Sequence, residues 1–176
     1  MKSFILGLLL YLFVFNAPVI LYLKYKEKVN PFEFLKLNKN IKKGLTTGLL
    51  ISLLFIAALI IKKFVLGFGS VNFNIGLLWV GGLLVGLFEE IPFRGFILQK
   101  LSKRVNFMIA NIITTILFVS VHLPIWLYGN VNLASSIPSV FVVSLVFGYL
   151  FEEYDSLWVT IVCHSVFNLC IWTRLG

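Results

Sequence analysis

The sequence has few charged residues. Only 12% of its 176 residues are Asp, Glu, Lys or Arg, whereas 60% are hydrophobic. A soluble domain of this length carries about a quarter charged residues, so the composition excludes an ordinary water-soluble domain and indicates a polytopic membrane protein. Internal repeats, low-complexity tracts and domain boundaries are also lacking. We therefore interpret residues 1–176 as a single transmembrane domain.

Cysteine is equally scarce. Cys163 and Cys170 lie seven positions apart on one predicted helix, about 10 Å along its axis, which is too far for a disulfide between them. Neither cysteine belongs to a metal-binding motif. The sequence also lacks the His-Glu-x-x-His pattern of zinc peptidases. We interpret both cysteines as small buried residues of a membrane helix.

Long apolar runs dominate the chain. A membrane-spanning helix needs about 20 mainly apolar residues. The first run is longer than a signal-peptide core and no small-residue cleavage site follows it, so we expect it to be retained. Residues 64–74 contain turn residues and are expected to form a loop. The sequence predicts an all-α fold with about six transmembrane helices, at residues 3–23, 44–61, 76–102, 106–127, 137–152 and 156–173.

Positive charge is concentrated in two short segments, residues 24–43 and 100–104. Short cytoplasmic loops of membrane proteins are rich in Lys and Arg, so both segments are predicted to be cytoplasmic and both termini to be outside. Lys62 and Lys63 would then lie outside, which opposes this orientation. No basic patch is interleaved with exposed aromatic residues on a polar domain, so we expect no nucleic-acid partner.

Ionisable side chains inside the predicted spans are the most informative feature. Glu89 and Glu90 lie in the third span, and the chain's two histidines, His122 and His164, lie in the fourth and sixth. Such a residue costs about 2.5–3.5 kcal/mol on insertion scales, so it usually faces the bundle interior and marks a function. Counting from the turn near Arg104 gives about 22 Å to Glu89 and 27 Å to His122. His164 lies about 12 Å deep, so tilt must bring it to the same level.

The spacing within the third span assigns its faces. Glu90 and Arg94 are four residues apart and are expected to pair. Glu89 points about 100° away from Glu90, on the side that carries Gly82 and Gly86, which permit close approach of another helix. Pro92 cannot donate a backbone N–H, so it predicts a kink and a free carbonyl beside Glu89.

Two further spans carry polar stripes. Together with the Glu89 helix, these stripes predict one polar intramembrane cavity. The stripe of the fourth span comprises Asn111, Thr115, Phe118 and His122, and that of the sixth comprises Thr160, His164 and Asn168.

This pattern resembles the CAAX protease and bacteriocin-processing family, also called the Abi family. The resemblance covers about residues 75–173, the motif-bearing core, and residues 1–74 carry no family signature. It implies an intramembrane endopeptidase that acts on a membrane-associated or lipidated peptide, as a multi-pass protein in the cell membrane of a prokaryote. The three motifs are Glu89-Glu90-x-x-x-Arg94, Phe118-x-x-x-His122 and His164-x-x-x-Asn168.

The resemblance also implies a role for each motif residue. Glu89 would be the general base that activates a water molecule, assisted by His122. His164 and Asn168 would stabilise the oxyanion. The supporting residues would be Glu90, Arg94 and Phe118.

The cofactor is less defined by the sequence. Glu89, His122 and His164 are also a plausible zinc set. We favour a metal-free mechanism with zinc as the alternative, because neither histidine has a histidine partner four residues away.

Three other interpretations stay open. The first is a non-catalytic immunity or scaffold protein on the same fold. The second is a proton-coupled transporter that relays protons along its acids and histidines. The third is a helix bundle whose polar groups only fix the register of its helices. The missing internal repeat opposes the transporter. The expense of ionisable groups compared with Ser, Thr, Asn or Gln opposes the last interpretation.

Overall fold

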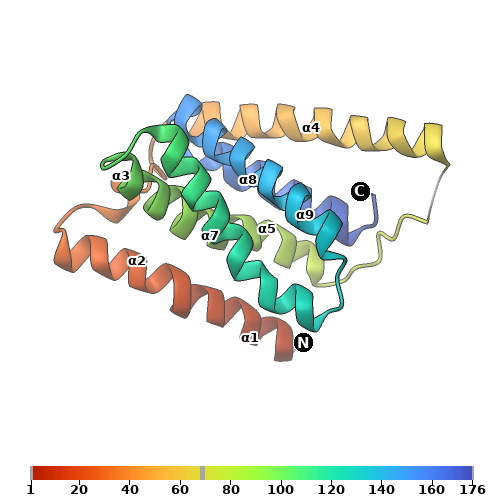
Figure 1. Cartoon of the computed structure of the whole chain (residues 1–176), viewed down its shortest axis with the longest axis horizontal. Coiled ribbons are helices and arrows are strands. Elements are labelled where there is room, and N and C mark those ends of the chain that lie inside the picture. Colours follow the sequence, from red (N-terminus) through yellow and green to blue (C-terminus); the bar gives the residue numbers. More distant parts are fainter. Residues whose placement is uncertain (1, 68–69, 176) are drawn as a thin grey trace.

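The computed structural model describes residues 2–67 and 70–175, and within these ranges it contains helices and no strand. Six long helical segments run back and forth between two ends of the molecule (Figure 1). The predicted all-α class is therefore confirmed. The N-terminal helix is a continuous run of four segments, namely α1 (Lys2–Leu10), η1 (Tyr11–Asn16), α2 (Ala17–Leu21) and η2 (Tyr22–Lys26). It is followed by α3 (Pro31–Phe34) and α4 (Ile41–Leu66).

The third long segment carries the acidic residues. It is continuous and is called the motif helix; it comprises α5 (Leu78–Glu90), η3 (Ile91–Leu98) and α6 (Gln99–Ser102). The η3 segment is a π-helix. Pro92 lies in its first turn, so the predicted kink takes the form of a widened turn and the helix continues beyond it. The last three helices are α7 (Phe107–Tyr128), α8 (Leu133–Tyr154) and α9 (Leu157–Trp172).

Side-chain caps fix where the last three helices begin. Asn106 Oδ1 accepts the N–H of Ile109 at 2.9 Å before α7, and Asn132 and Ser156 occupy the same position before α8 and α9. Such caps satisfy backbone N–H groups that have no partner within the helix. Short capped turns therefore make α7, α8 and α9 antiparallel neighbours.

Ion pairs gather the basic segments at one end of the molecule, called the basic end. Lys36 and Lys39 contact the Asp155 carboxylate at 2.7 and 3.3 Å, and Lys100 pairs with Glu27. At the opposite end the N–H of Asn72 donates to the carbonyl of Thr173. Residues 24–43 and 100–104 therefore lie on the same side, as the predicted topology requires. Which side of a membrane this is stays a prediction.

Four helices of the described chain are long and apolar enough to cross a membrane, namely Leu6–Lys26, Ile41–Leu66, Phe107–Tyr128 and Leu133–Tyr154. The motif helix matches the predicted third span in position but contains four charged side chains, and α9 has only 16 residues. Both run between the same two ends as the other four (Figure 1). The number of six spans stays a prediction.

The predicted boundary between the second span and the loop after it is wrong. The loop expected at residues 64–74 begins later, because α4 continues through Phe64, Val65 and Leu66. These apolar residues extend the helix past Lys62 and Lys63. The helix ends at Gly67, whose φ of 100° is incompatible with a helix. Residues 68–69 of the expected loop lie outside the described residues.

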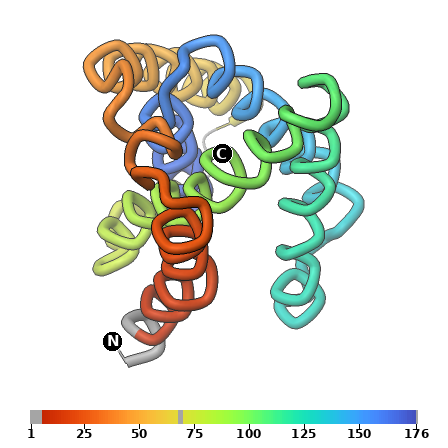
Figure 2. The backbone as a smooth tube through the Cα atoms, turned by 90° about the vertical axis from the view of Figure 1, so that its left-hand side faces the viewer, coloured from red at the N-terminus to blue at the C-terminus, as the bar shows by residue number. Residues whose placement is uncertain are grey.

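The motif helix lies between the N-terminal helix and α9, and α7 lies to one side (Figure 2). Its close approach to α9 is confirmed at both predicted glycines. A Cβ on Gly86 would lie 2.6 Å from the carbonyl oxygen of Ile161, and a Cβ on Gly82 would lie 2.5 Å from the Leu169 side chain. At Gly86 the contact is with backbone, so only a hydrogen there lets the helices approach this closely.

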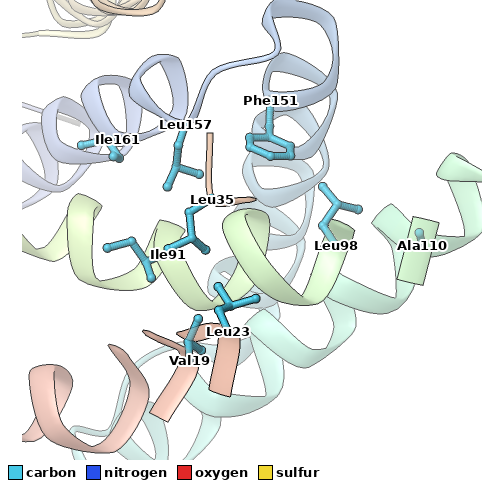
Figure 3. Packing of buried hydrophobic residues seen from close by; sticks show 9 residues of the cluster. All are labelled: Val19, Leu23, Leu35, Ile91, Leu98, Ala110, Phe151, Leu157 and Ile161. Carbon is cyan, nitrogen blue, oxygen red and sulfur yellow. The ribbon is translucent and has the colours of Figure 1, made fainter. Parts of the chain in front are cut away.

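An apolar cluster joins the helices next to the basic end. It packs the motif helix against its neighbours on several sides (Figure 3). Cores of this kind are close-packed, so the cluster holds the motif helix at a fixed depth and rotation. Its members are Val19, Leu23, Leu35, Ile91, Leu98, Ala110, Phe151, Leu157 and Ile161.

Candidate active site

A fully buried ion pair forms the base of the site. Arg94 Nη1 donates to Glu90 Oε1 at 2.8 Å, which confirms the predicted pair. Arg94 Nη2 donates to both the carbonyl oxygen and the Oγ of Ser144, at 3.0 and 2.7 Å. Arg94 Nε has no hydrogen-bond partner among the described residues, so the charge is compensated mainly by Glu90 and by the two bonds to Ser144. The pair therefore also anchors the motif helix to α8.

Glu90 has a second partner that helix spacing does not reveal. His164 Nδ1 lies 2.7 Å from Glu90 Oε1. Because a carboxylate only accepts hydrogen bonds, Nδ1 carries the proton and donates it. The contact depends on the close packing of α9 on the motif helix at Gly86.

Glu89 lies beside this pair and is 4% exposed. Its Oε1 accepts the hydroxyl of Tyr11 at 2.8 Å. Its Oε2 is buried, has no hydrogen-bond partner in the described part of the chain, and faces two imidazoles. The distances are 3.7 Å to His122 Nε2 and 3.6 Å to His164 Nε2, both longer than a direct hydrogen bond. The predicted convergence of Glu89, His122 and His164 is thus present.

The His122 ring is fixed by its own helix. Its Nδ1 lies 2.7 Å from the carbonyl oxygen of Phe118, one turn earlier on α7. A carbonyl accepts, so Nδ1 carries a proton and donates it, and Nε2 faces Glu89.

Phe118 packs between the charged and the titratable groups. The Arg94 guanidinium lies 4.6 Å from the centre of its ring, which is cation–π geometry. The rings of His122 and His164 lie 4.7 and 5.8 Å from the same ring, centre to centre. Phe118 therefore separates the buried ion pair from His122 and fixes the positions of both imidazoles.

A cavity of about 700 Å³ opens beside these groups. Glu89, His122 and His164 line it, together with Asn168, which follows His164 by one turn of α9. The cavity differs from the prediction because its lining is mixed. Polar residues from the motif helix, α7 and α9 are joined by serines of α8 and by apolar side chains such as Val85 and Ile125.

The outer parts of the predicted polar stripes do not reach this cavity. Asn111 Nδ2 donates to the carbonyl of Leu145 at 2.9 Å, and the Thr115 hydroxyl lies 3.0 Å from that of Ser144. Both residues hold α7 against α8. Thr160 donates to the carbonyl of Leu157. Side chains of one stripe therefore contact different helices, because each helix packs against different elements along its length.

The N-terminal helix contributes two residues that sequence reasoning missed. One is Tyr11, the hydrogen-bond donor to Glu89. The other is Asn16, whose Nδ2 donates to the carbonyls of Phe88 and Tyr11 at 3.0 and 2.9 Å. The Phe88 carbonyl is the one that Pro92 was predicted to leave without a helical partner. An asparagine inside an apolar span is a signal for interhelical hydrogen bonding that identifies Asn16 but not its partner.

The proposed zinc ligands lie close together but are not arranged around a common point for a metal ion. Among the side chains that the structure describes, no group of three His, Cys, Asp or Glu is placed to hold a metal ion. Glu89, His122 and His164 converge, yet the two Nε2 atoms face the same carboxylate oxygen at 3.6–3.7 Å. As placed, the three side chains therefore do not form a zinc-ligand set.

Comparison with known proteins identifies one family. The family model described as "Type II CAAX prenyl endopeptidase Rce1-like" matches residues 70–170, which is more than half of the chain. This range contains all three motifs, whereas the N-terminal helix lies outside it. No curated protein and no solved structure matches the chain significantly.

Proposed function

The chain belongs to the type II CAAX prenyl endopeptidase Rce1-like family, and we propose that it is an intramembrane endopeptidase in which Glu89 activates a water molecule. Family membership and four apolar helices make it an integral membrane protein of the CAAX-protease type. The substrate we propose is a membrane-associated or lipidated peptide. One observation carries the mechanism: a buried carboxylate oxygen without a hydrogen-bond partner in the described chain faces two imidazole Nε2 atoms beside a cavity.

The first step proposed is attack by water on the peptide carbonyl. A water molecule hydrogen-bonded to Glu89 Oε2 loses a proton to it as its oxygen bonds to the carbonyl carbon. His122 Nε2 lies close enough to Oε2 to orient the same water. When the C–N bond breaks, the proton on Glu89 passes to the leaving amine, which returns the carboxylate to its starting form.

The second element proposed is an oxyanion site on α9. His164 donates from Nδ1 to Glu90 and its Nε2 faces Glu89, so a proton on Nε2 lies between the two carboxylates and the cavity. Its Nε2–H and the side-chain amide of Asn168 are the donors offered to the developing oxyanion. Arg94 compensates the charge of Glu90 and so makes a second buried acid tolerable beside Glu89.

The experiment is cleavage of a panel of prenylated and bacteriocin-leader peptides by the purified protein in detergent. Glu89→Gln is the test variant and Glu153→Gln, an exposed change at the basic end, is the matched control. We expect cleavage by the wild type and the control, loss in Glu89→Gln at equal thermal stability, and no effect of a chelator. Equal cleavage by all three proteins refutes the role of Glu89. Cleavage by none of them favours a non-catalytic immunity or scaffold protein.

A further inference from the structure

We propose that the N-terminal helix completes the active site and that Tyr11 is a positioning residue for Glu89. This inference rests on the proposed function. The Tyr11 hydroxyl donates to Oε1 at 2.8 Å, while Oε2 has no such partner among the described residues. A free carboxylate has two equivalent oxygens and a soft terminal torsion. The hydrogen bond makes them different, so that Oε1 is the anchor and Oε2 faces the imidazoles.

The position of Tyr11 is itself fixed from the motif helix. Asn16 donates through one amide group to the carbonyl of Tyr11 and to that of Phe88, the residue before Glu89. The same side chain therefore links the backbone of the donor to the backbone next to the acceptor. Asn16 is 1% exposed, so water does not compete for these bonds. Tyr11 starts the π-helical segment η1, whose wider turn accommodates the bridging amide.

Two cavities meet at Glu89, and this makes an anchor necessary. A smaller cavity of about 200 Å³ lies between the N-terminal helix, the motif helix and α7, where Phe15, Pro92 and Val121 line it. Tyr11 and Glu89 line both this cavity and the larger one. Without an anchor the carboxylate has room to turn toward the smaller cavity, away from His164. The Tyr11 hydroxyl holds it toward the imidazoles.

The kinetic test is Tyr11→Phe, which removes the hydroxyl and keeps the ring. The matched control is Tyr25→Phe, the same change at an exposed position of the same helix. Hydrogen bonds to charged groups correspond to about a 10–100-fold effect. We expect kcat to fall by about that factor in Tyr11→Phe, with KM and the melting temperature close to those of the control. An unchanged kcat, or a rise in KM at unchanged kcat, overturns the inference.

A second measurement tests the contact without any substrate. Infrared spectra of protein carrying ring-labelled tyrosine, wild type minus Tyr11→Phe, isolate the C–O stretch of Tyr11. We expect this band to shift in Glu89→Gln, because a neutral amide is a weaker acceptor than a carboxylate. An unshifted band overturns the inference. If the band shifts in Glu89→Gln but the wild type cleaves no peptide, the proposed function is refuted and the Tyr11–Glu89 contact is established.

Discussion

Removing the charge of Arg94 should destabilise the protein strongly. The guanidinium is fully buried and makes one hydrogen bond to Glu90 and two to Ser144, and it lies over the Phe118 ring. Arg94→Met keeps most of the volume and leaves the Glu90 carboxylate buried without its arginine partner. Breaking a buried pair on one side costs about 3–5 kcal/mol. We expect a loss of stability of that size.

The double variant Glu90→Gln/Arg94→Met tests the electrostatic origin of this loss. With both charges removed, no uncompensated carboxylate is left, so the double variant should be more stable than Arg94→Met alone. The assay is reversible unfolding in mixed micelles, with the wild type and the exposed Glu153→Gln variant as references. A loss below about 1 kcal/mol in Arg94→Met, or a double variant no more stable than the single one, shows that the uncompensated Glu90 charge is not the cause of the destabilisation.

Two further perturbations have definite expected outcomes. Gly86→Ala places a Cβ 2.6 Å from the Ile161 carbonyl oxygen and should separate α9 from the motif helix, which lowers both the melting temperature and the peptidase activity. The control is Gly7→Ala, where the new Cβ has no neighbour within 4 Å, and it should change neither quantity. Equal behaviour of the two variants contradicts the close packing at Gly86. The second concerns pH: partial burial opposes ionisation of Asp155, but two lysines outweigh it and hold its pKa below the ordinary value. A lowered pKa contributes stability above the unfolded pKa of about 4, and this contribution is lost as pH falls through the folded pKa. Unfolding measured between pH 7 and 3 should therefore show a smaller acid loss in Lys36→Met than in the wild type, and parallel curves contradict it.

The helices were predictable because lipid imposes length and apolarity on each one separately. The prediction of 106–127 agrees with α7 at Phe107–Tyr128 to within one residue at each end. The error at α4 arose because residues 64–66 were assigned to the loop together with the turn residues that follow them, although they are apolar and α4 continues past Lys62 and Lys63. Long lysine side chains extend to reach water while the helix continues, so a lysine does not mark a helix end by itself.

The site was predictable where one helix determines the geometry. The Glu90–Arg94 pair follows from a spacing of four residues, and the depths of Glu89 and His122 follow from counting along one hairpin. Contacts between helices distant in sequence have no such rule. The Tyr11–Glu89 and His164–Glu90 hydrogen bonds join residues 78 and 74 positions apart. They depend on which helices pack together and at what rotation, which glycines and the apolar cluster decide jointly.

Single-turnover cleavage of one identified peptide substrate tests whether Glu89 is the general base. The comparison is between the wild type and Glu89→Gln at equal folded fraction and saturating substrate. A general base contributes about 10²–10⁴-fold, so we expect the rate to fall by at least about 100-fold with little change in substrate affinity. A Glu89→Gln rate within about threefold of the wild-type rate contradicts the role of Glu89 as general base.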